Sequence, residues 1–336
     1  MKLSVIIPVH NGGEQFKYCL DALRRSTRTA DEIIVVNDGS TDDTAATAAN
    51  NSCRVINLDG MPRGAALARN RGADEATGDV LVFLDADVAV HTDTLWRIEM
   101  HFQENPEIAA LFGSYDDNPP VRNIVSLYKN LQHHYVHQKG KRKTFTFWTG
   151  CGAVRRNIFV ETGGFDEARA KRGRPLMEDI EFGMRMVRGG HVIMLFPDVQ
   201  VVHFKRWTLT SWLRTEIFNR ALPWSKLILA NGEIPDDLNV GRSGRVSALA
   251  AWLLVFFLIS TFFIPVLWMG AGLSLFVILL VNSDFYLFLS RRGGVFFGMV
   301  SVALHTTYFL YSSAVFGIAM VYYRLLPHTG TQSSRS

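Results

Sequence analysis

Two aspartates separated by one residue, Asp85 and Asp87, directly follow the apolar run 80–84. Residues two apart on a strand face the same side, so both carboxylates would meet one target. Hard divalent cations such as Mg²⁺ and Mn²⁺ prefer oxygen ligands of this kind. A cation held there would neutralise the charge that builds on a phosphate leaving group. The pattern therefore predicts metal-assisted chemistry on a phosphorylated substrate.

A second acidic pair, Glu178 and Asp179, opens a predicted helix that runs to Arg188. The helix dipole favours the ionised form of a carboxylate at this end, and a general base must be ionised to accept a proton. A helix cap made of the same two residues is the structural alternative. The pair therefore indicates either a base or a cap.

Further polar side chains stand at predicted strand ends. Asp38 follows the run 32–37, and the end of the first strand, 8–12, shares its edge. Ligands of open α/β sheets bind at this edge, although ordinary βα turns use the same residue types. Arg69 can form two parallel hydrogen bonds to a phosphate or pair with a nearby aspartate. His203, after the strand 199–202, is either a further metal ligand or a polar turn residue.

The elements that position these residues alternate along the chain. The predicted strands are 1–8, 32–37, 54–58 and 80–84, and the predicted helices between them are 14–25, 41–50 and 63–77. Such alternation implies an α/β fold with a mostly parallel sheet that helices cover on both faces. Beyond Asp87 the pattern predicts a helix at 92–103, a strand at 108–115 and a helix at 123–137. A basic stretch at 169–174 is either a mobile segment beside a site or a solvated charge run.

Composition divides the chain in two. The 78 residues 246–323 carry only three charges, Asp284, Arg291 and Arg292, which excludes a wholly soluble protein as the default. The first 230 residues carry 29 basic and 27 acidic side chains, so no charge excess indicates nucleic-acid binding. Three cysteines are too few for a disulfide framework and lack metal-ligand spacing.

The apolar region predicts about three transmembrane helices, at 246–268, 271–289 and 295–322, with a tight turn at 269–272 and a polar tail at 324–336. A hydrocarbon core of about 30 Å takes roughly 20 helical residues. Arginines precede the first span and separate the second from the third, so the positive-inside rule places the catalytic domain in the cytoplasm, at a bacterial-type inner membrane. Three spans would put the C-terminus outside, whereas Arg324 and Arg335 argue for the inside.

An amphipathic segment, 207–240, joins the two regions. Its apolar residues share one helical face, and its three tryptophans suit a water–lipid interface. The face comprises Leu209, Trp212, Leu213, Ile217, Ala221 and Trp224. Arg220 interrupts this face and Pro223 should bend the helix. We expect an interfacial helix followed by a linker, with a core helix of the soluble domain as the alternative.

An ordered series of motifs carries a family resemblance. The series comprises Val-Ile-Ile-Pro at 5–8, Val-Asn-Asp-Gly-Ser-Thr-Asp at 36–42, Ala-Arg-Asn-Arg-Gly at 68–72, Phe-Leu-Asp-Ala-Asp at 83–87, the stretches 149–156 and 163–167, and Glu-Asp at 178–179. Over roughly 1–205 the chain resembles a family 2 glycosyltransferase with the GT-A nucleotide-sugar-binding fold. We therefore expect a GT-A domain at 1–206.

The resemblance also implies roles for individual residues. Asp179, with Glu178, would supply the catalytic base of an inverting transfer, and a divalent metal, Mg or Mn, would be held by Asp85, Asp87 and His203. The implied nucleotide-sugar site comprises Pro8, His10, Asn11, Asp38, Arg69, Asp85, Ala86, Asp87, Gly150, Gly152, Arg206 and Trp207. The small residues at 150–153 would let the backbone approach the sugar.

The run His-Phe-Lys-Arg-Trp at 203–207 is similar to the Gln-x-x-Arg-Trp motif of processive polysaccharide synthases, with His in place of Gln. That departure, together with so few spans, favours transfer of single sugars. The leading hypothesis is a membrane-anchored enzyme that moves a sugar from a nucleotide-diphospho-sugar, by resemblance a UDP-sugar, to a hydroxyl of a lipid or lipid-linked acceptor. The alternatives are a polyprenyl-phosphate glycosyltransferase and a non-catalytic membrane scaffold.

Overall fold

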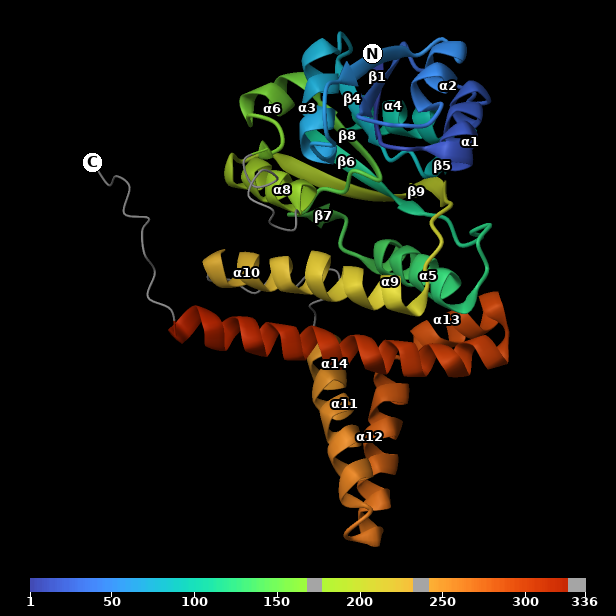
Figure 1. Ribbon diagram of the computed structural model, residues 1–336. Helices are drawn as coiled ribbons and strands as arrows, with labels where there is room; N and C mark the ends of the chain where they lie inside the picture. The colour runs from blue at the N-terminus through green and yellow to red at the C-terminus, as the bar shows by residue number, and fades with distance from the viewer. Residues whose placement is uncertain (168–176, 232–241, 326–336) are drawn as a thin grey trace, which may run out of the picture. The chain divides into compact units, whose positions relative to one another are not determined.

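The computed structural model describes residues 1–167, 177–231 and 242–325. The chain divides into two compact units after Thr208, two residues beyond the domain end predicted at 206 (Figure 1). The basic stretch 169–174, most of the linker before 240 and the polar tail after 325 lie outside the described residues.

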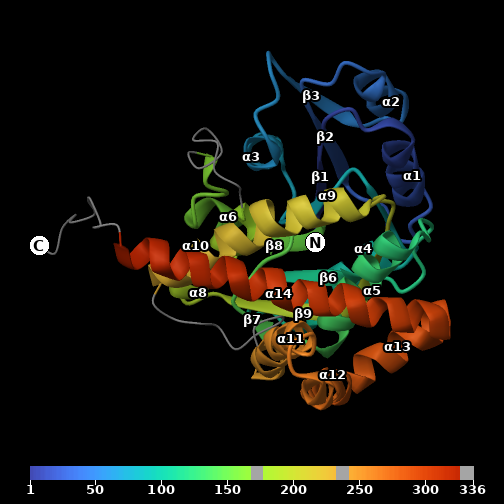
Figure 2. The same cartoon turned by 60° about the horizontal axis from the view of Figure 1, so that its bottom comes forward.

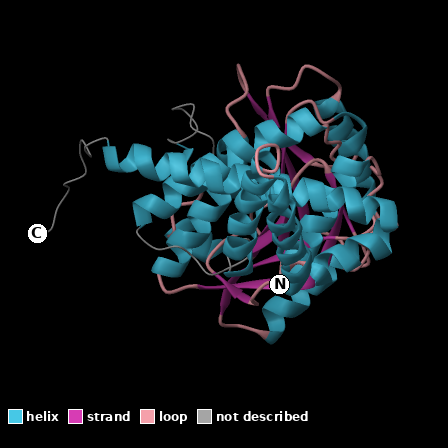
Figure 3. Ribbon diagram, turned by 90° about the horizontal axis from the view of Figure 1, so that it is seen from below, coloured by secondary structure: helices cyan, strands magenta, loops and turns pink. Residues whose placement is uncertain are grey.

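The first unit is built on one sheet with the strand order β3-β2-β1-β4-β8-β6-β9-β5, and β7 pairs with β9 (strands are magenta in Figure 3). The strands are β1 Leu3–Val9, β2 Glu32–Asp38, β3 Arg54–Leu58, β4 Val80–Leu84, β5 Val88–Val90, β6 Ile108–Tyr115, β7 Lys143–Thr144, β8 Cys151–Arg155 and β9 Val192–His203. Each strand expected from an apolar run is present, so the α/β class is confirmed.

The sheet is parallel in one half and mixed in the other. β1 pairs in parallel with β2 and β4, and β2 with β3, as the alternation of strands and helices predicts. β8 then runs antiparallel to both β4 and β6, while β6 and β9 are parallel to each other. The expectation of a mostly parallel sheet therefore describes the N-terminal half. Beyond β4 the strict βαβ alternation ends, and β8 inserts between β4 and β6.

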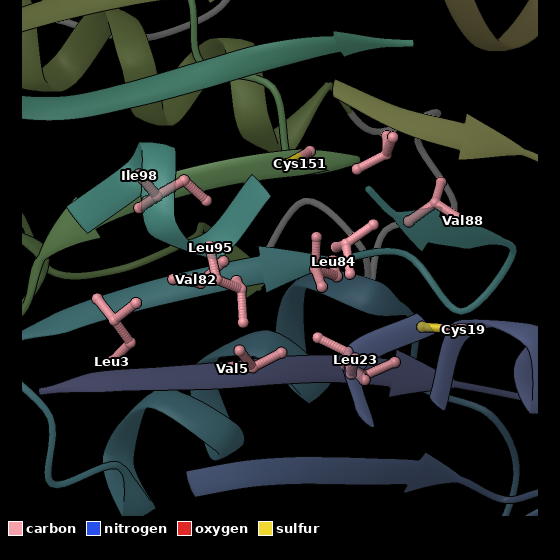
Figure 4. Close-up of a cluster of buried hydrophobic side chains, with 14 of the residues drawn as sticks. Leu3, Val5, Cys19, Leu23, Val82, Leu84, Val88, Leu95, Ile98 and Cys151 are labelled. Carbon is pink, nitrogen blue, oxygen red and sulfur yellow. The ribbon is translucent and has the colours of Figure 1, made fainter. Parts of the chain in front are cut away.

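Helices cover both faces of the sheet. They are α1 Gly13–Arg24, α2 Thr44–Asn50, α3 Ala65–Glu75, α4 Thr94–Glu104, α5 Ile124–Lys139, α6 Arg156–Glu161 and α8 Glu178–Arg188. Because side chains alternate along a strand, β1 sends Leu3 and Val5 to the core beneath α1 and α4, and Ile6 to the core beneath α3 and α8. Figure 4 shows the first of these cores, where the free cysteines Cys19 and Cys151 are buried.

The second unit is helical. It comprises α9 Leu209–Arg214, a π-helix η1 Thr215–Ala221, α10 Leu222–Asn231, α11 Arg242–Ser260, a short 3₁₀ turn η2 Pro265–Leu267, α12 Trp268–Val281, α13 Ser283–Gly293 and α14 Val295–Leu325. The π-helix stands just before Pro223, whose ring would clash with the carbonyl four residues earlier in a regular α-helix. The wider π turn accommodates this residue, so the segment 209–231 stays helical.

The apolar segments differ from the predicted spans. The first helix ends at Ser260, because Ile264 precedes Pro265 and takes the extended conformation that a following proline favours. The turn predicted at 269–272 is wrong, since these residues lie inside α12. A Cβ on Gly270 would lie 2.8 Å from the Phe257 ring, so this glycine allows α11 and α12 to pack closely.

The predicted second span, 271–289, is interrupted at Asn282, where α12 and α13 meet at a bend of 75°. By length and composition, two of the described helices can cross a membrane, at 243–260 and 295–322. The bent pair of α12 and α13 would make a third span if it is counted as one.

Candidate active site

One buried arginine joins the two acidic motifs. The Arg69 side chain donates from Nη1 to Glu178 Oε1 (2.9 Å) and from Nη2 to Asp85 Oδ1 (2.8 Å). Glu178 is 109 residues further along the chain, so the fold creates this junction. α3 can present Arg69 there because it lies close against the sheet, where a Cβ on Gly72 would come within 2.5 Å of Ile6.

The aspartates of the Asp-Ala-Asp motif occupy a turn between β4 and β5 rather than a strand. Strand periodicity is therefore not what places them. Asp85 is held by Arg69, whereas Asp87 Oδ2 lies 3.8 Å from His203 Nε2. The Asp87 main chain is fixed by a hydrogen bond from Phe204 N to Asp87 O (2.9 Å). Burial, followed by the negative charge of Asp85, raises the pKa of Asp87 to about 6.

This arrangement fits a hard cation in its chemistry but does not form a complete ligand set. Two carboxylates whose mutual repulsion raises a pKa would be stabilised by a positive ion between them. Over 1–167, 177–231 and 242–325, however, no group of three or more His, Cys, Asp or Glu side chains is placed to hold a metal. The nearest imidazole, His203, stacks on Tyr115 with 4.1 Å between ring centroids. Asp85 and Asp87 thus offer two oxygen ligands, and a bound diphosphate would have to complete the shell.

Asp179 lies at the start of α8, next to the Arg69–Glu178 pair. Its Oδ1 accepts a hydrogen bond from Ile180 N (2.8 Å). Burial and then the Glu178 carboxylate raise the pKa of Asp179 to about 7, and Arg69 offsets only part of this effect. Burial and the Glu178 carboxylate therefore outweigh the helix dipole that we expected to favour the ionised form of this carboxylate. A carboxyl group with a pKa near neutrality is instead well matched to general base catalysis.

Asp38 has a different environment. Its two carboxylate oxygens accept hydrogen bonds from Arg63 N (2.8 Å) and Gly64 N (2.7 Å), so Asp38 ties the end of β2 to the loop before α3. Asp38 is buried and forms no hydrogen bond or ion pair with the residues around Arg69. The structure therefore gives Asp38 a role in closing a loop at the carboxyl edge of the sheet.

The loop after β1 is joined to the loop after β2. His10 Nδ1 contacts Asp38 O (2.9 Å), Asn11 N donates to Ser40 Oγ (2.9 Å), and Thr41 N donates to Asn11 Oδ1 (2.8 Å). Asn11 adopts a φ of 51°, a conformation that asparagine tolerates better than most residues. Pro8 is half-buried in β1 opposite Val36. These contacts bring the predicted residues of the two loops together at one edge.

The predicted glycines meet protein atoms. A Cβ on Gly150 would lie 2.3 Å from the Trp148 ring, and a Cβ on Gly152 would lie 2.3 Å from the Trp148 carbonyl oxygen. Glycine is thus required at both positions by the packing of the segment before β8. This reason is independent of the predicted approach of the backbone to a sugar.

The segment after β9 adds a cation that the sequence analysis did not single out. Lys205 lowers the pKa of Asp87, in opposition to burial and Asp85, and its Nζ lies 4.9 Å from the centroid of Trp207. Trp207 is buried, and its main-chain N–H donates to Ser126 Oγ of α5 (2.7 Å), whereas Arg206 is exposed. In the sequence, this role of Lys205 could have been inferred only from its position two residues after His203. Ala86 is half-buried in the turn between the two aspartates.

Two cavities border this region. One, of about 550 Å³, is lined by Met61, Pro62 and Arg63, beside the amide that binds Asp38. The other, of about 510 Å³, is lined by Phe165 and Arg185, among others. Neither is lined by Asp85, Asp87 or Asp179. The cavity beside Asp38 is the better placed of the two for a ligand at the carboxyl edge of the sheet.

Comparison with known proteins bears on this arrangement. Residues 4–163 match the family model of glycosyl transferase family 2. The chain is 47% identical over 93 residues to the uncharacterized glycosyltransferase YibD of Escherichia coli, which covers 27% of each chain. It is 27% identical over 239 residues to the O-antigen chain rhamnosyltransferase RfbN of Salmonella typhimurium. This alignment covers 67% of this chain and 74% of RfbN.

Solved structures share the fold. The mannosyltransferase PcManGT of Pyrobaculum calidifontis, in complex with GDP-Man and Mn²⁺, aligns over 95% of this chain and 86% of its own, with a TM-score of 0.56 and 18% identity. TarS 1–349 of S. aureus, in complex with UDP-GlcNAc, aligns over 98% and 93%, with a TM-score of 0.51 and 18% identity. The motif series, the sheet and these matches agree: residues 4–163 match a family 2 glycosyltransferase domain, and the first unit has the GT-A fold.

Proposed function

We propose that this protein is a membrane-anchored, metal-dependent, inverting glycosyltransferase. It moves one sugar at a time from a nucleotide-diphospho-sugar to a hydroxyl group of a lipid or lipid-linked acceptor. The observation that carries the proposal is the double ion pair of Arg69, which holds the Asp-Ala-Asp turn beside the Glu178–Asp179 pair. A group that binds the diphosphate and a group that accepts a proton are thereby brought into one site.

Asp179 is the general base of the proposed reaction. The acceptor oxygen transfers its proton to Asp179 and attacks the anomeric carbon, while the bond from that carbon to the diphosphate breaks on the opposite face. One displacement of this kind inverts the anomeric configuration, in contrast to the two-step retaining route. A pKa of about 7 gives Asp179 both a large ionised fraction at neutral pH and adequate basicity.

The protein holds the leaving group near Asp85 and Asp87. A divalent cation, when bound by these two carboxylates, would neutralise the charge that develops on the departing diphosphate. Arg69 keeps Asp85 in place and partly offsets the charge of the Glu178–Asp179 pair. His203, whose Nε2 lies 3.8 Å from Asp87 Oδ2, is proposed as the third protein ligand.

The donor is proposed to be a UDP-sugar. The related structures carry GDP-Man in one case and UDP-GlcNAc in the other, so the fold accepts more than one nucleotide. We propose that Asp38, His10 and Asn11, at the carboxyl edge beside the 550 Å³ cavity, surround the nucleoside. Pro8, Gly150, Gly152, Arg206 and Trp207 remain proposed contacts of the donor.

Membrane attachment is proposed from the apolar helices. Two described helices have the length and composition to cross a bilayer. An anchor of this kind would hold the catalytic domain within reach of an acceptor that cannot leave the lipid phase. We propose that the domain faces the cytoplasm, since arginines flank the apolar segments.

A donor screen tests the binding part of the proposal. The full chain in detergent, with Mn²⁺ present, is heated with UDP-glucose, UDP-N-acetylglucosamine, GDP-mannose or dTDP-rhamnose. A donor at 100 times its Kd should raise the free energy of unfolding by about 2.7 kcal/mol. We expect stabilisation by a UDP-sugar in wild type and in the surface control Asp74→Asn, and its loss in Asp87→Asn. Stabilisation by only a GDP- or dTDP-sugar would correct the nucleotide, and none by any donor would contradict donor binding.

A transfer assay tests the catalytic part. The protein, the stabilising donor with a radiolabelled sugar, and Mn²⁺ are incubated with a lipid extract of the host membranes. We expect label in the organic phase, its loss with a chelator, and its return with added Mn²⁺. Tight donor binding without transfer to any lipid fraction and without donor hydrolysis would instead support a non-catalytic scaffold.

A further inference from the structure

The second unit contains a hairpin that is apolar on all sides. α11 and α12 run together in opposite directions, and the 38 residues 246–283 contain no charged side chain. The tip between the two helices is the most exposed apolar part, with Phe262 89% and Phe263 81% exposed. Most of the large apolar side chains along both helices are also exposed, Trp252, Phe256 and Phe276 among them. A surface that is this apolar and carries no charge suits contact with acyl chains.

α14 has a different environment, although its composition would also allow it to cross a membrane. It runs across the direction of the hairpin in Figure 1, and in Figure 2 the hairpin is seen nearly end-on while α14 still extends across the view. Along its length α14 contacts α10, α11, α13 and η1. Its Tyr311 hydroxyl lies 3.2 Å from Glu216 Oε2 of η1, and Glu216 also pairs with Arg220 (3.1 Å).

The hairpin and α14 cannot both follow the membrane normal, because they cross. Placing α14 along the normal would draw the charged side chains of η1 into the hydrocarbon, where charged groups are strongly disfavoured. It would also leave the apolar hairpin parallel to the membrane surface. Placing the hairpin along the normal avoids both penalties.

We propose that α11 and α12 form a re-entrant membrane hairpin, and that α14 lies in the plane of the interface. The chain then enters and leaves the bilayer on one face. The start of α11 and the end of α14 then share that face, unlike in the three-span arrangement expected from the sequence. The inference rests on the membrane attachment proposed above but not on sugar transfer.

The depth of the hairpin follows from one contact. Trp252 Nε1 of α11 donates to Ser313 Oγ of α14 (3.0 Å), so α11 passes α14 near Trp252. From Trp252 to the end of α11 at Ser260, eight residues at about 1.5 Å each extend about 12 Å. With the tip added, this is well short of a hydrocarbon core of about 30 Å. The phenylalanines of the tip therefore end among acyl chains.

Polar groups at the base of the hairpin suit the headgroup region. Asn282 Nδ2 donates to Ser247 Oγ (2.9 Å), which closes the two ends of the hairpin on each other. Arg245, one turn from the start of α11, and Arg291, at the end of α13, are both exposed. Cations at this depth would meet the phosphates of the lipid headgroups.

Reporter fusions test the shared face. Green fluorescent protein, which fluoresces when it stays in the bacterial cytoplasm, and alkaline phosphatase, which is active only after export, are each fused to the N-terminus and, separately, to the last residue. We expect fluorescence from both ends and phosphatase activity from neither. Reporters active on opposite sides at the two ends would overturn the proposal, as would recovery of the protein in the soluble fraction.

Charged substitutions test the depth. The double variant Phe262→Asp/Phe263→Asp should leave the membrane fraction or fail to accumulate in it, because the aspartates would sit in hydrocarbon. The control Val160→Asp replaces an exposed apolar residue of α6 and should be retained like wild type. Full retention of the double variant would place the tip in water and contradict a re-entrant hairpin. Donor binding, measured separately in detergent, distinguishes this failure from failure of the proposed enzymatic function.

Discussion

Two carboxylates of the first unit, Asp38 at the end of β2 and the partly buried Asp179 at the start of α8, meet opposite environments. Asp38 accepts one backbone hydrogen bond on each oxygen, from Arg63 and Gly64. Asp179 lies instead beside Glu178, and burial and this neighbour raise the pKa of its carboxyl to about 7. The first carboxylate is satisfied by neutral donors of the protein itself, whereas burial and the neighbouring Glu178 disfavour the charge of the second.

The difference indicates that Asp38 has a structural role, whereas Asp179 is suited to proton transfer. Hydrogen bonds from two backbone amides hold the Asp38 side chain and close a loop. Burial of Asp179 beside Glu178 lowers the stability of the folded protein at neutral pH and is useful only if a proton or a ligand relieves it. Both aspartates looked alike in the sequence, as acids next to predicted element ends.

The largest expected effect concerns Arg69, which pairs with both Asp85 and Glu178. Arg69→Met leaves Asp85 and Glu178 without their cation, and breaking a buried ion pair in this way costs about 3–5 kcal/mol. We expect a large fall in the melting temperature and no detectable transfer. The control Arg71→Met lies two residues away on α3, with an exposed side chain, and should change the free energy of unfolding by less than about 0.5 kcal/mol.

If Arg69→Met unfolds the protein outright, Arg69→Lys supplies a measurable variant, because one ammonium cannot fork onto both carboxylates. Equal stability of Arg69→Met and Arg71→Met would show that the double ion pair contributes nothing.

The next effect concerns Asp38. In Asp38→Asn an amide nitrogen replaces one acceptor oxygen and must face a backbone N–H, which should lower the free energy of unfolding by about 1.5–3 kcal/mol. Thermal unfolding in detergent without donor measures this change, with Asp74→Asn as the exposed control. A melting temperature equal to that of wild type would remove the structural role and leave Asp38 to the nucleoside alone.

Asp179→Asn should act on stability in the opposite direction. Because the folded-state pKa of Asp179 is raised to about 7 from an ordinary value of 3.8, the folded protein binds a proton that the unfolded chain has released between these limits. Stability from this group is therefore full below about pH 4 and is lost as the pH rises through 7. Above pH 7 the asparagine variant should melt at a higher temperature than wild type.

The comparison is made between wild type and Asp179→Asn in the same buffers from pH 4.5 to 8, since other groups titrate in this range, among them Asp87 with its pKa raised to about 6. A difference between the two proteins that does not change with pH would mean that the pKa of Asp179 is not raised in the folded protein.

The smallest expected effect concerns the loops around Asp38. Ser40→Ala removes the acceptor of the Asn11 N–H on an exposed loop, which should cost about 0.5–1.5 kcal/mol without altering the pH dependence of stability. Chemical unfolding at two pH values measures both quantities. A change in the pH dependence of the free energy of unfolding would show that the loop around Asp38 interacts electrostatically with Asp179.

The sequence was sufficient for the parts of this picture that depend on local pattern. The apolar runs predicted β2, β3, β4 and β6 closely, because side-chain periodicity directly reflects burial. Single residues such as Asp85 and Asp179 could be named from motifs. The direction of the pKa shift of Asp179 could not, since it depends on how deeply α8 is buried and on Glu178.

Long-range geometry accounts for the remaining differences. No pattern indicates that Arg69 contacts both Asp85 and Glu178, because the two partners are far apart in the chain. Hydropathy likewise treated 246–268 as one span, since the break at Pro265 falls within an uninterrupted apolar run. Composition records how apolar a segment is, and only the packing of α14 against η1 and α10 indicates how that segment would lie in a membrane.

The central claim is that Asp179 removes the proton from a hydroxyl acceptor, and single-turnover transfer by Asp179→Asn tests it most directly. Donor and Mn²⁺ are held at saturation, and the rate of labelling of the lipid acceptor is compared with that of wild type and of Asp74→Asn. Loss of a general base predicts a rate about 10²–10⁴-fold lower, with unchanged affinity for the donor. Near-normal turnover by Asp179→Asn would contradict the claim and would indicate an acceptor that is already an anion, such as a polyprenyl phosphate.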